Sequence, residues 1–331
     1  MIGKRRPARS LLAAVLGISV MVGLNHQAAA EPKMTLKLGH IANEDNIWHK
    51  AFLKFAEEVS NRTNGEVAVK IYPNEQLGKE VDEIKGVQMG TVDFSMIGES
   101  LQTWVPSAVL IGVPYAIHSI DHLDRIVQGP IGDKIKKDIV EKTGLEPIAY
   151  FARGPRNLTS NRPIKTPDDL QGIKLRVSNV PLHVKVWEAL GAKVTPMSLS
   201  EVFTSLQNHT IEAQENPLAF IKSQSFYEVQ DYVNKTEHVI TWIYIVGNAK
   251  RLAKMDPRYR DAIYESAKVM QAYERQLFLQ DEQKLEAEMK EKGMTFVDAD
   301  KAAFAAKAKG AIKDALSPEL FDLYEQILAT E

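Results

Sequence analysis

The chain of 331 residues contains no cysteine. Disulfides, thiolate metal ligands and a cysteine nucleophile are therefore excluded, and the fold must be held by its core alone. Three motifs are also missing: the GxxxxGK[ST] loop that cradles nucleotide phosphates, the GxSxG nucleophile turn and the HExxH zinc site. These absences argue against an ATP site and against familiar hydrolase chemistry. We expect no cofactor, no metal site and no catalytic residue.

Long apolar runs are confined to the N-terminus. The run from Leu11 to Leu24 is too short for a comfortable bilayer span of about 20 residues. Ala28-Ala29-Ala30 follows it, and four basic residues precede it: Lys4, Arg5, Arg6 and Arg9. A basic region, a short apolar region and small residues predict a Sec signal peptide over residues 1–30, cleaved after Ala30. The alternative is an uncleaved membrane anchor. Because the signal peptide directs export, we expect a periplasmic protein.

The remaining chain has no excess of positive charge. Residues 1–30 hold four of the 41 basic residues and none of the 43 acidic ones, so the mature chain carries a net charge of −6. A mildly acidic surface gives no electrostatic reason to bind DNA or RNA. About 300 mature residues exceed one comfortable core and favour two domains.

Strand and helix patterns alternate along both halves. Met34–His40 and Val67–Tyr72 alternate like strands and flank a helical apolar stripe from Trp48 to Val59. This βαβ order predicts a parallel sheet with a right-handed crossover. The later strands and helices are expected at these ranges: helix Gly78–Met89, strand Val92–Ile97, strand Lys174–Val177, helix Leu182–Leu190, strand Lys193–Pro196, helix Ser200–Leu206 and strand Thr210–Gln214.

The segments that follow Val239 predict how the two halves of the chain are joined. Val239–Val246 is an apolar, β-branched strand that should return to the first half. The segment from Pro257 to Lys292 contains no glycine or proline after Pro257, and it predicts a helix about 50 Å long. Ala302–Ile327 predicts C-terminal helices. We place residues 31–153 with 242–281 in domain I, and residues 154–241 with 282–331 in domain II.

The segment Gly172–Pro217 is the best candidate for a binding site. Arg176 lies at the end of an apolar-alternating strand, and Asn216 precedes Pro217 at the end of another. Open α/β sheets bind ligands at strand ends. A guanidinium matches a carboxylate with two parallel hydrogen bonds. Because no nucleophile and base accompany them, the pattern favours binding of a small carboxylate without chemistry. The alternative for Arg176 is a surface ion pair.

The order of several short motifs resembles the periplasmic solute-binding proteins of tripartite ATP-independent periplasmic (TRAP) transporters. The resemblance covers the whole mature chain and is nearest to binders of carboxylate sugars, including sialic acid. It rests on these segments: Ile71–Gly78 (IYPNEQLG), Val92–Phe94, Val113–Tyr115, Thr159–Ile164 (TSNRPI), Gly172–Val177 (GIKLRV), Thr195–Phe203 (TPMSLSEVF) and Gln214–Pro217 (QENP).

The resemblance implies a fold, a function and a set of ligand contacts. The fold is α/β, with two doubly wound lobes around a cleft and a long helix spanning both. The protein would be a monomer that delivers a carboxylate solute to TRAP membrane permease subunits. By resemblance Arg176 meets the ligand carboxylate, Arg156 is a second arginine near it, and Asn216 completes the clamp. Further matches, looser than these, are Glu99, Asn179 and Glu215.

The sequence leaves alternatives open for the function, for a metal site and for the ligand. A Glu99/Glu215 pair across a cleft would suit an exported sugar-acid hydrolase or lyase. A periplasmic sensor would use the same fold. His118 and His122 share a helical face without a third metal ligand. Trp48, Trp104, Tyr115 and Phe203 are candidates for stacking on a sugar, although aromatics are more often core. For the ligand we favour an aldonate or uronate over sialic acid, and either over a C4-dicarboxylate.

Overall fold

The computed structural model describes residues 1–3 and 31–330, except the side chain of Gln283. Most of the predicted signal peptide, residues 4–30, lies outside the described residues, so its cleavage after Ala30 stays a prediction. Among the described residues, no helix combines the length and the apolar character needed to cross a membrane. The domain limits expected from the sequence also stay a prediction.

The first sheet has five strands in the order β2-β1-β3-β10-β4. Its strands are β1 (Met34–Gly39), β2 (Val67–Tyr72), β3 (Phe94–Ile97), β4 (Leu145–Arg153) and β10 (Thr241–Asn248). β1 is parallel to β2 and β3, which confirms the predicted βαβ unit. β10 returns to this sheet as expected, but it runs antiparallel to β3 and β4.

The second sheet has six strands in the order β11-β9-β5-β8-β6-β7. These are β5 (Arg156–Ser160), β6 (Lys174–Val177), β7 (Lys193–Pro196), β8 (Ala213–Pro217), β9 (Tyr232–Lys235) and β11 (Thr295–Asp298). β6 is parallel to β7 and β8, whereas β5 is antiparallel to β8 and β9. Each sheet thus contains one strand that runs antiparallel to its neighbours, β10 in the first sheet and β5 in the second. Each of these two strands is the first that the chain forms after it passes from the other sheet.

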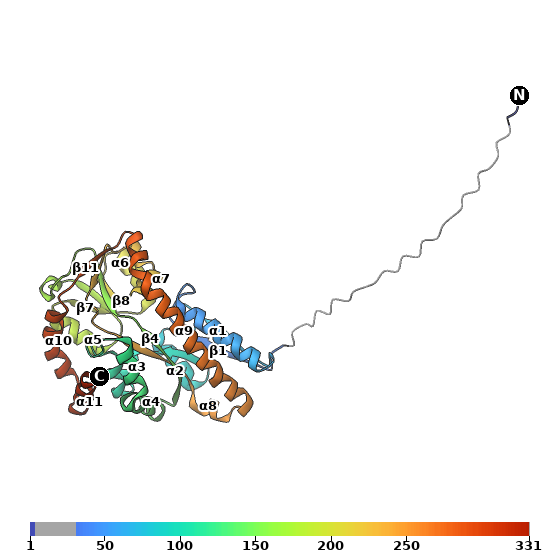
Figure 1. Cartoon of the computed structure of the whole chain (residues 1–331), viewed down its shortest axis with the longest axis horizontal. Coiled ribbons are helices and arrows are strands. Elements are labelled where there is room, and N and C mark those ends of the chain that lie inside the picture. Colours follow the sequence, from blue (N-terminus) through green and yellow to red (C-terminus); the bar gives the residue numbers. More distant parts are fainter. Residues whose placement is uncertain (4–30, 331) are drawn as a thin grey trace. The chain divides into compact units, whose positions relative to one another are not determined.

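Helices cover both faces of the sheets (Figure 1). The α-helices are α1 (Ile47–Arg62), α2 (Glu80–Met89), α3 (Ile120–Gln128), α4 (Pro130–Thr143), α5 (Pro181–Leu190), α6 (Val202–Gln207), α7 (Leu218–Ser223), α8 (Ala249–Lys254), α9 (Pro257–Glu291), α10 (Lys301–Ala315) and α11 (Pro318–Ala329). The 3₁₀ helices of the described residues are η1 (Glu99–Thr103), η2 (Pro106–Gly112), η3 (Pro167–Leu170), η4 (Leu199–Glu201) and η5 (Phe226–Glu228). The two sheets with their helices confirm the expected two-lobed α/β fold.

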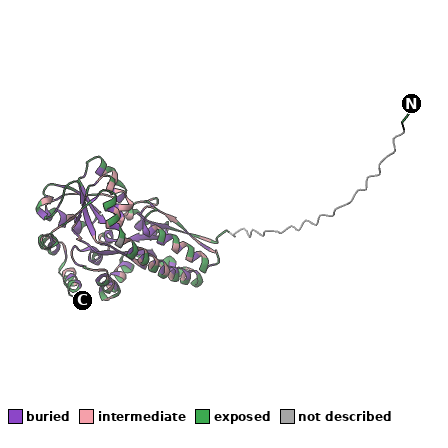
Figure 2. Cartoon of the chain, turned by 45° about the horizontal axis from the view of Figure 1, so that its top comes forward, coloured by how far each residue is buried: buried purple, intermediate pink, exposed green. Residues whose placement is uncertain are grey.

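Two hydrophobic cores lie on opposite faces of the strands. Figure 2 shows the strands buried among helices whose outer residues are exposed. β10 explains the arrangement. Its alternate residues Trp242 and Tyr244 belong to one core, while Ile243 and Ile245 belong to the other. Because successive side chains of a strand point to opposite faces, a strand covered on both sides must be apolar throughout. This requirement accounts for the unbroken apolar run around β10.

The helix α9 has 35 residues and extends over about 52 Å at 1.5 Å per residue. It packs on α1, on β4 of the first sheet and on α7, which follows β8 of the second. Ile263 and Met270 belong to the same core as Phe220 of α7. The helix therefore spans both lobes, in agreement with the sequence.

One predicted strand was placed too early. Thr210–Gln214 was expected, but β8 covers Ala213–Pro217. The amide groups of Thr210 and Ile211 donate to the carbonyl oxygen of Ser205, so they complete the C-terminal turn of α6. They cannot donate to a neighbouring strand at the same time, because each amide has one proton. The later start brings Asn216 within the strand.

Candidate functional site

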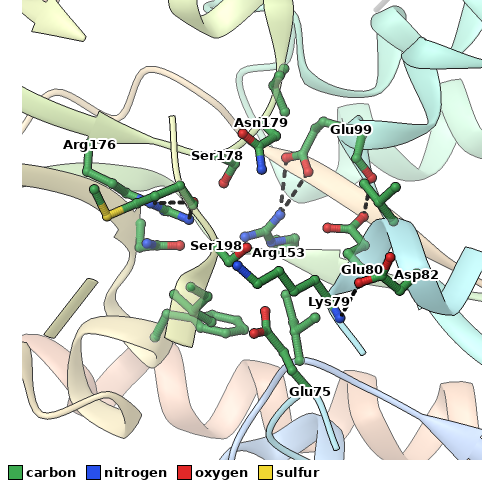
Figure 3. A pocket seen from close by; sticks show the side chains of 18 residues that line it. Glu75, Lys79, Glu80, Asp82, Glu99, Arg153, Arg176, Ser178, Asn179 and Ser198 are labelled. Atoms are coloured by element: carbon green, nitrogen blue, oxygen red, sulfur yellow. Dashed lines mark hydrogen bonds and ion pairs between the residues drawn. The ribbon is translucent and has the colours of Figure 1, made fainter. Parts of the chain in front are cut away.

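A cavity of about 230 Å³ lies where the carboxyl ends of strands from both sheets meet (Figure 3). From the second sheet, Arg176 contributes at the end of β6 and Asn216 near the end of β8. From the first sheet, Glu99 follows β3 and Arg153 ends β4. This is the general ligand position of open α/β sheets. The fold therefore gathers charged side chains that are far apart in sequence.

Arg176 is positioned by the alternation of β6. Its neighbours Leu175 and Val177 are fully buried in one core, so the arginine points to the other side of the strand. Its Nε and Nη2 donate to the carbonyl oxygen of Met197, at 3.1 and 2.7 Å. Nη1 is buried and has no partner among the described residues. The side chain is thus held in place with a donor unused.

Arg176 also lacks an acid of its own. Only 2 % of it is exposed, and no carboxylate of the described residues lies within ion-pair distance. Burial lowers the pKa of Arg176 to about 10, because removal from water disfavours the charged form while the negative charge of Glu215 compensates only in part. The guanidinium remains charged at neutral pH. It is a buried cation that an anionic ligand group would neutralise.

Arg153 faces the same cavity from β4. Its Nη1 donates to both carboxylate oxygens of Glu99, at 3.1 Å each. Its guanidinium carbon lies 5.5 Å from the ring centroid of Trp48 and 5.7 Å from that of Phe220. Burial raises the pKa of Glu99, but the charges of Arg153 and Arg156, together with His183, outweigh this effect, and the pKa of Glu99 is lowered overall. Glu99 is therefore ionised.

The N-terminus of α2 supplies an acidic part of the wall. Gly78 turns the chain with a φ of +116°, a conformation that favours glycine. Lys79, Glu80 and Asp82 follow and line the cavity. Glu80 accepts hydrogen bonds from the Ser100 hydroxyl and, at 3.0 Å, from the Gly98 amide. Burial raises the pKa of Glu80 against these bonds.

Asn216 and Asn179 complete the wall on the second sheet. Asn216 is 3 % exposed; its amide donates to Gln214 Oε1 at 2.7 Å, and its Oδ1 accepts from Arg156 Nη2 at 3.2 Å. Asn179 lies in the loop between β6 and α5 and is exposed. The first is fixed by its neighbours, whereas the second is free to orient toward a ligand.

Arg156 and Glu215 lie beside this wall but do not line the cavity. Arg156 Nη2 donates to Glu215 Oε1 at 2.8 Å and Nε donates to Oε2. His238 Nε2 lies 3.0 Å from the same Oε2. Burial raises the pKa of Glu215, but Arg156 and His238 hold it well below its ordinary value. Both oxygens of Glu215 are thereby engaged.

Of the six predicted contacts, the structure brings four to the cavity: Arg176, Asn216, Glu99 and Asn179. It places Arg156 and Glu215 in the adjoining buried ion pair. From the sequence, Arg156 was preferred over the nearby Arg153. A signal for it was present, because Arg153 ends an apolar strand just as Arg176 does. Direct ligand contact by any of these residues stays a prediction.

The aromatic and histidine candidates lie elsewhere. The cavity lining includes Phe220 but none of the four aromatics considered from the sequence: Trp48, Trp104, Tyr115 and Phe203. His122 Nε2 lies 3.0 Å from the carbonyl oxygen of Ile327. Within residues 31–330, no group of three or more metal-binding side chains is gathered in a way that would hold a metal ion.

Two contacts join the lobes at the rim of the cavity. The Ser200 hydroxyl donates to Glu75 Oε2. Lys79 Nζ lies 3.2 Å from Glu201 Oε2. Ser200 and Glu201 belong to η4 beyond β7, whereas Glu75 and Lys79 follow β2. These contacts exist only while the two lobes lie together.

Comparison with known proteins gives one consistent result. The model of the family described as bacterial extracellular solute-binding protein, family 7, matches residues 38–318. Solute-binding protein RD1_1052 of Roseobacter denitrificans is 52% identical over 312 residues, covering 94% of this chain and 96% of the relative. The 2,3-diketo-L-gulonate-binding periplasmic protein YiaO of Escherichia coli is 33% identical, with 85% and 86% covered.

A solved structure supports the same relationship. The TRAP periplasmic solute-binding protein RD1_1052 from Roseobacter denitrificans, with bound L-galactonate, superposes with a TM-score of 0.88 at 53% identity. The match covers 90% of this chain and 99% of that one.

Proposed function

Because the chain belongs to family 7 of the bacterial extracellular solute-binding proteins, we propose that it captures a hydroxylated sugar acid in the periplasm and delivers it to a TRAP permease. It is a binding protein and not an enzyme, as its family and its relatives are. An aldonate of the L-galactonate type is the proposed ligand.

The observation that carries this proposal is the unpaired guanidinium of Arg176. It is buried in the cavity wall, and its Nη1 has no partner in the described part of the chain. A buried charge is costly unless it is paired. A ligand carboxylate at this position would supply both the missing charge and a hydrogen-bond acceptor. The site is therefore suited to an anion.

The remaining charges favour a ligand with one carboxylate and several hydroxyls. Four acids line the cavity in addition to the arginines: Glu75, Glu80, Asp82 and Glu99. Hydroxyl groups donate hydrogen bonds to carboxylates, whereas a second ligand carboxylate beside them would be repelled. This contrast favours a sugar acid over a C4-dicarboxylate.

The size of the cavity and the ligands of the relatives narrow the class of sugar acid. About 230 Å³ is below the ~300–1,000 Å³ of pockets for drug-sized ligands, which favours a six-carbon acid over the larger sialic acid. RD1_1052, at 53% identity, holds L-galactonate, and YiaO is named for 2,3-diketo-L-gulonate. Both ligands are six-carbon acids with a hydroxylated chain.

Binding and delivery would follow from closure of the two lobes. Contacts made by one ligand to both lobes are available only in the closed form, so the ligand shifts the population toward it. A permease that recognises the closed form would receive loaded protein only. We propose that the protein acts as a monomer, since each chain contains both walls of the cavity.

Calorimetry on the purified protein tests the proposal. Titration with L-galactonate, D-glucuronate, sialic acid and a C4-dicarboxylate should give the tightest binding for a six-carbon sugar acid. A ligand at 100 times its Kd should raise the unfolding free energy by about 2.7 kcal/mol. Turnover of any of these acids, or tightest binding to a dicarboxylate, would contradict the proposal.

A further inference from the structure

Arg153 stands where the chain leaves the first sheet. It ends β4, opposite Thr241 of β10, and only two residues separate it from the start of β5 in the second sheet. The position is constrained from both sides, because β4 pairs along its length with β10 and only Gly154 and Pro155 connect it to β5. A side chain at this point faces the cavity from between the lobes, as Figure 3 shows.

The guanidinium of Arg153 is fixed by three neighbours. Glu99, from η1, accepts hydrogen bonds from its Nη1 with both carboxylate oxygens. Trp48 of α1 and Phe220 of α7 lie on its flanks, with their own ring centroids 4.9 Å apart in an edge-on contact. A cation beside aromatic rings is attracted to their faces. Arg153 is therefore a rigid part of the wall.

Not all donors of Arg153 are used. Nη1 donates to Glu99, and Nε is buried without a partner among the described residues. Nη2 forms no hydrogen bond to a described residue and is not among the buried unpartnered atoms. This nitrogen is therefore not fully buried, and it belongs to a side chain that lines the cavity.

We propose that Arg153 determines the length of the acid that the cavity accepts. Its fixed bulk limits the space beyond the carboxylate held by Arg176, and its Nη2 donates to an oxygen of the ligand chain. A six-carbon acid fills the remaining cavity of about 230 Å³, whereas a longer acid meets the side chain. This inference rests on the proposed function, because it assumes that the ligand is a sugar acid.

A change of Arg153 to serine tests the inference. The affinities of wild type and Arg153→Ser are measured by calorimetry for D-erythronate, L-galactonate and sialic acid, which increase in length. We expect the ratio of galactonate to sialic acid affinity to fall at least about tenfold in the variant, since a lost charge-assisted contact alone is worth about that much. D-erythronate should lose less than L-galactonate.

Two further variants make the result interpretable. Arg153→Ser leaves Glu99 as an unpaired buried acid, which could destabilise the fold. The double variant Arg153→Ser/Glu99→Gln removes both charges and avoids this problem. Circular dichroism checks that each variant is folded. Arg162→Ser is the matched control: Arg162 is exposed, and it donates to the Asp169 carbonyl oxygen away from the cavity. It should keep the wild-type affinities.

The outcomes separate the two proposals. If wild type binds none of the acids, the proposed function fails. If wild type binds L-galactonate and the Arg153 variants weaken all acids by the same factor, Arg153 contributes charge only and the length inference is wrong. A changed ratio in both Arg153 variants, with an unchanged ratio in the control, supports it.

Discussion

Arg156 and Arg176 are equally buried, each 2 % exposed, but only Arg156 has a carboxylate partner in the described part of the chain. Arg156 is neutralised by Glu215 within the folded protein. Arg176 faces the cavity without an ion-pair partner among the described residues. The two arginines should therefore differ in what they stabilise: the first the fold, the second the complex.

The first prediction concerns Arg176 and ligand affinity. Arg176→Lys keeps the charge but loses the planar fork, so the affinity for L-galactonate should fall at least about tenfold. Arg176→Ala should cost roughly 2–5 kcal/mol, or about 30- to 4,000-fold, because the ligand carboxylate is left without its partner. Calorimetry measures both values. Unchanged affinity in Arg176→Lys would remove this residue from the site.

The second prediction concerns Arg156 and the empty protein. Arg156→Ala leaves Glu215 buried beside His238 alone, and breaking a buried ion pair costs about 3–5 kcal/mol of unfolding free energy. Urea unfolding without ligand measures the loss. Arg156→Gln/Glu215→Gln removes both charges and should recover part of it. Arg176→Ala should be no less stable than wild type in the same assay, since it removes an unpaired charge.

The third prediction is a pH dependence that originates in α9. Glu274 is 1 % exposed, both of its carboxylate oxygens lack a partner among the described residues, and burial raises its pKa from 4.5 to about 8. The folded state thus holds this proton more tightly than the unfolded state. Its stabilising effect is complete below about pH 4.5 and is lost as the pH rises through 8.

Glu274→Gln isolates this effect. The amide is neutral at every pH, so the variant should gain unfolding free energy relative to wild type as the pH rises from 5 to 9. The gain should be on the order of a few kcal/mol, from 1.36 kcal/mol per unit of pKa shift. Urea unfolding at several pH values measures it. A difference that stays constant with pH would show that Glu274 does not titrate in this range.

The fourth prediction concerns the ion pair at the cavity rim. Lys79 and Glu201 are each 51 % exposed, so their bond between the lobes is worth only about 0.2–1 kcal/mol. Glu201→Gln should raise the rate of ligand release up to about fivefold, and added salt should reduce the difference from wild type. Stopped-flow dissociation measures the rate.

A control for the rim is available on α1. Lys54 forms ion pairs with Glu57 and Glu58 of the same helix. Lys54→Ala removes surface ion pairs of the same kind, but these pairs lie within one helix and do not join the lobes. It should leave the release rate unchanged, and an equal acceleration in both variants would mean that the rim contact has no special role.

Most elements of the fold follow from local pattern. β2, β6 and β7 begin and end where the sequence predicts, and α9 lacks glycine and proline after its first residue. These segments are determined by alternation, by helical spacing and by breakers, which act over a few residues. The antiparallel direction of β10 was not predicted, because strand direction within a sheet depends on the path of the whole chain.

The sequence by itself determined the α/β class, the return of β10 to the first sheet and the placing of Arg176 at the end of a strand. The tertiary structure decided which arginines are neutralised within the fold. Arg156 meets Glu215 across 59 residues, and Arg153 meets Glu99 across 54. Local patterns carry no information on such distant pairs, because ion pairing depends on which strand ends the folded sheets bring together.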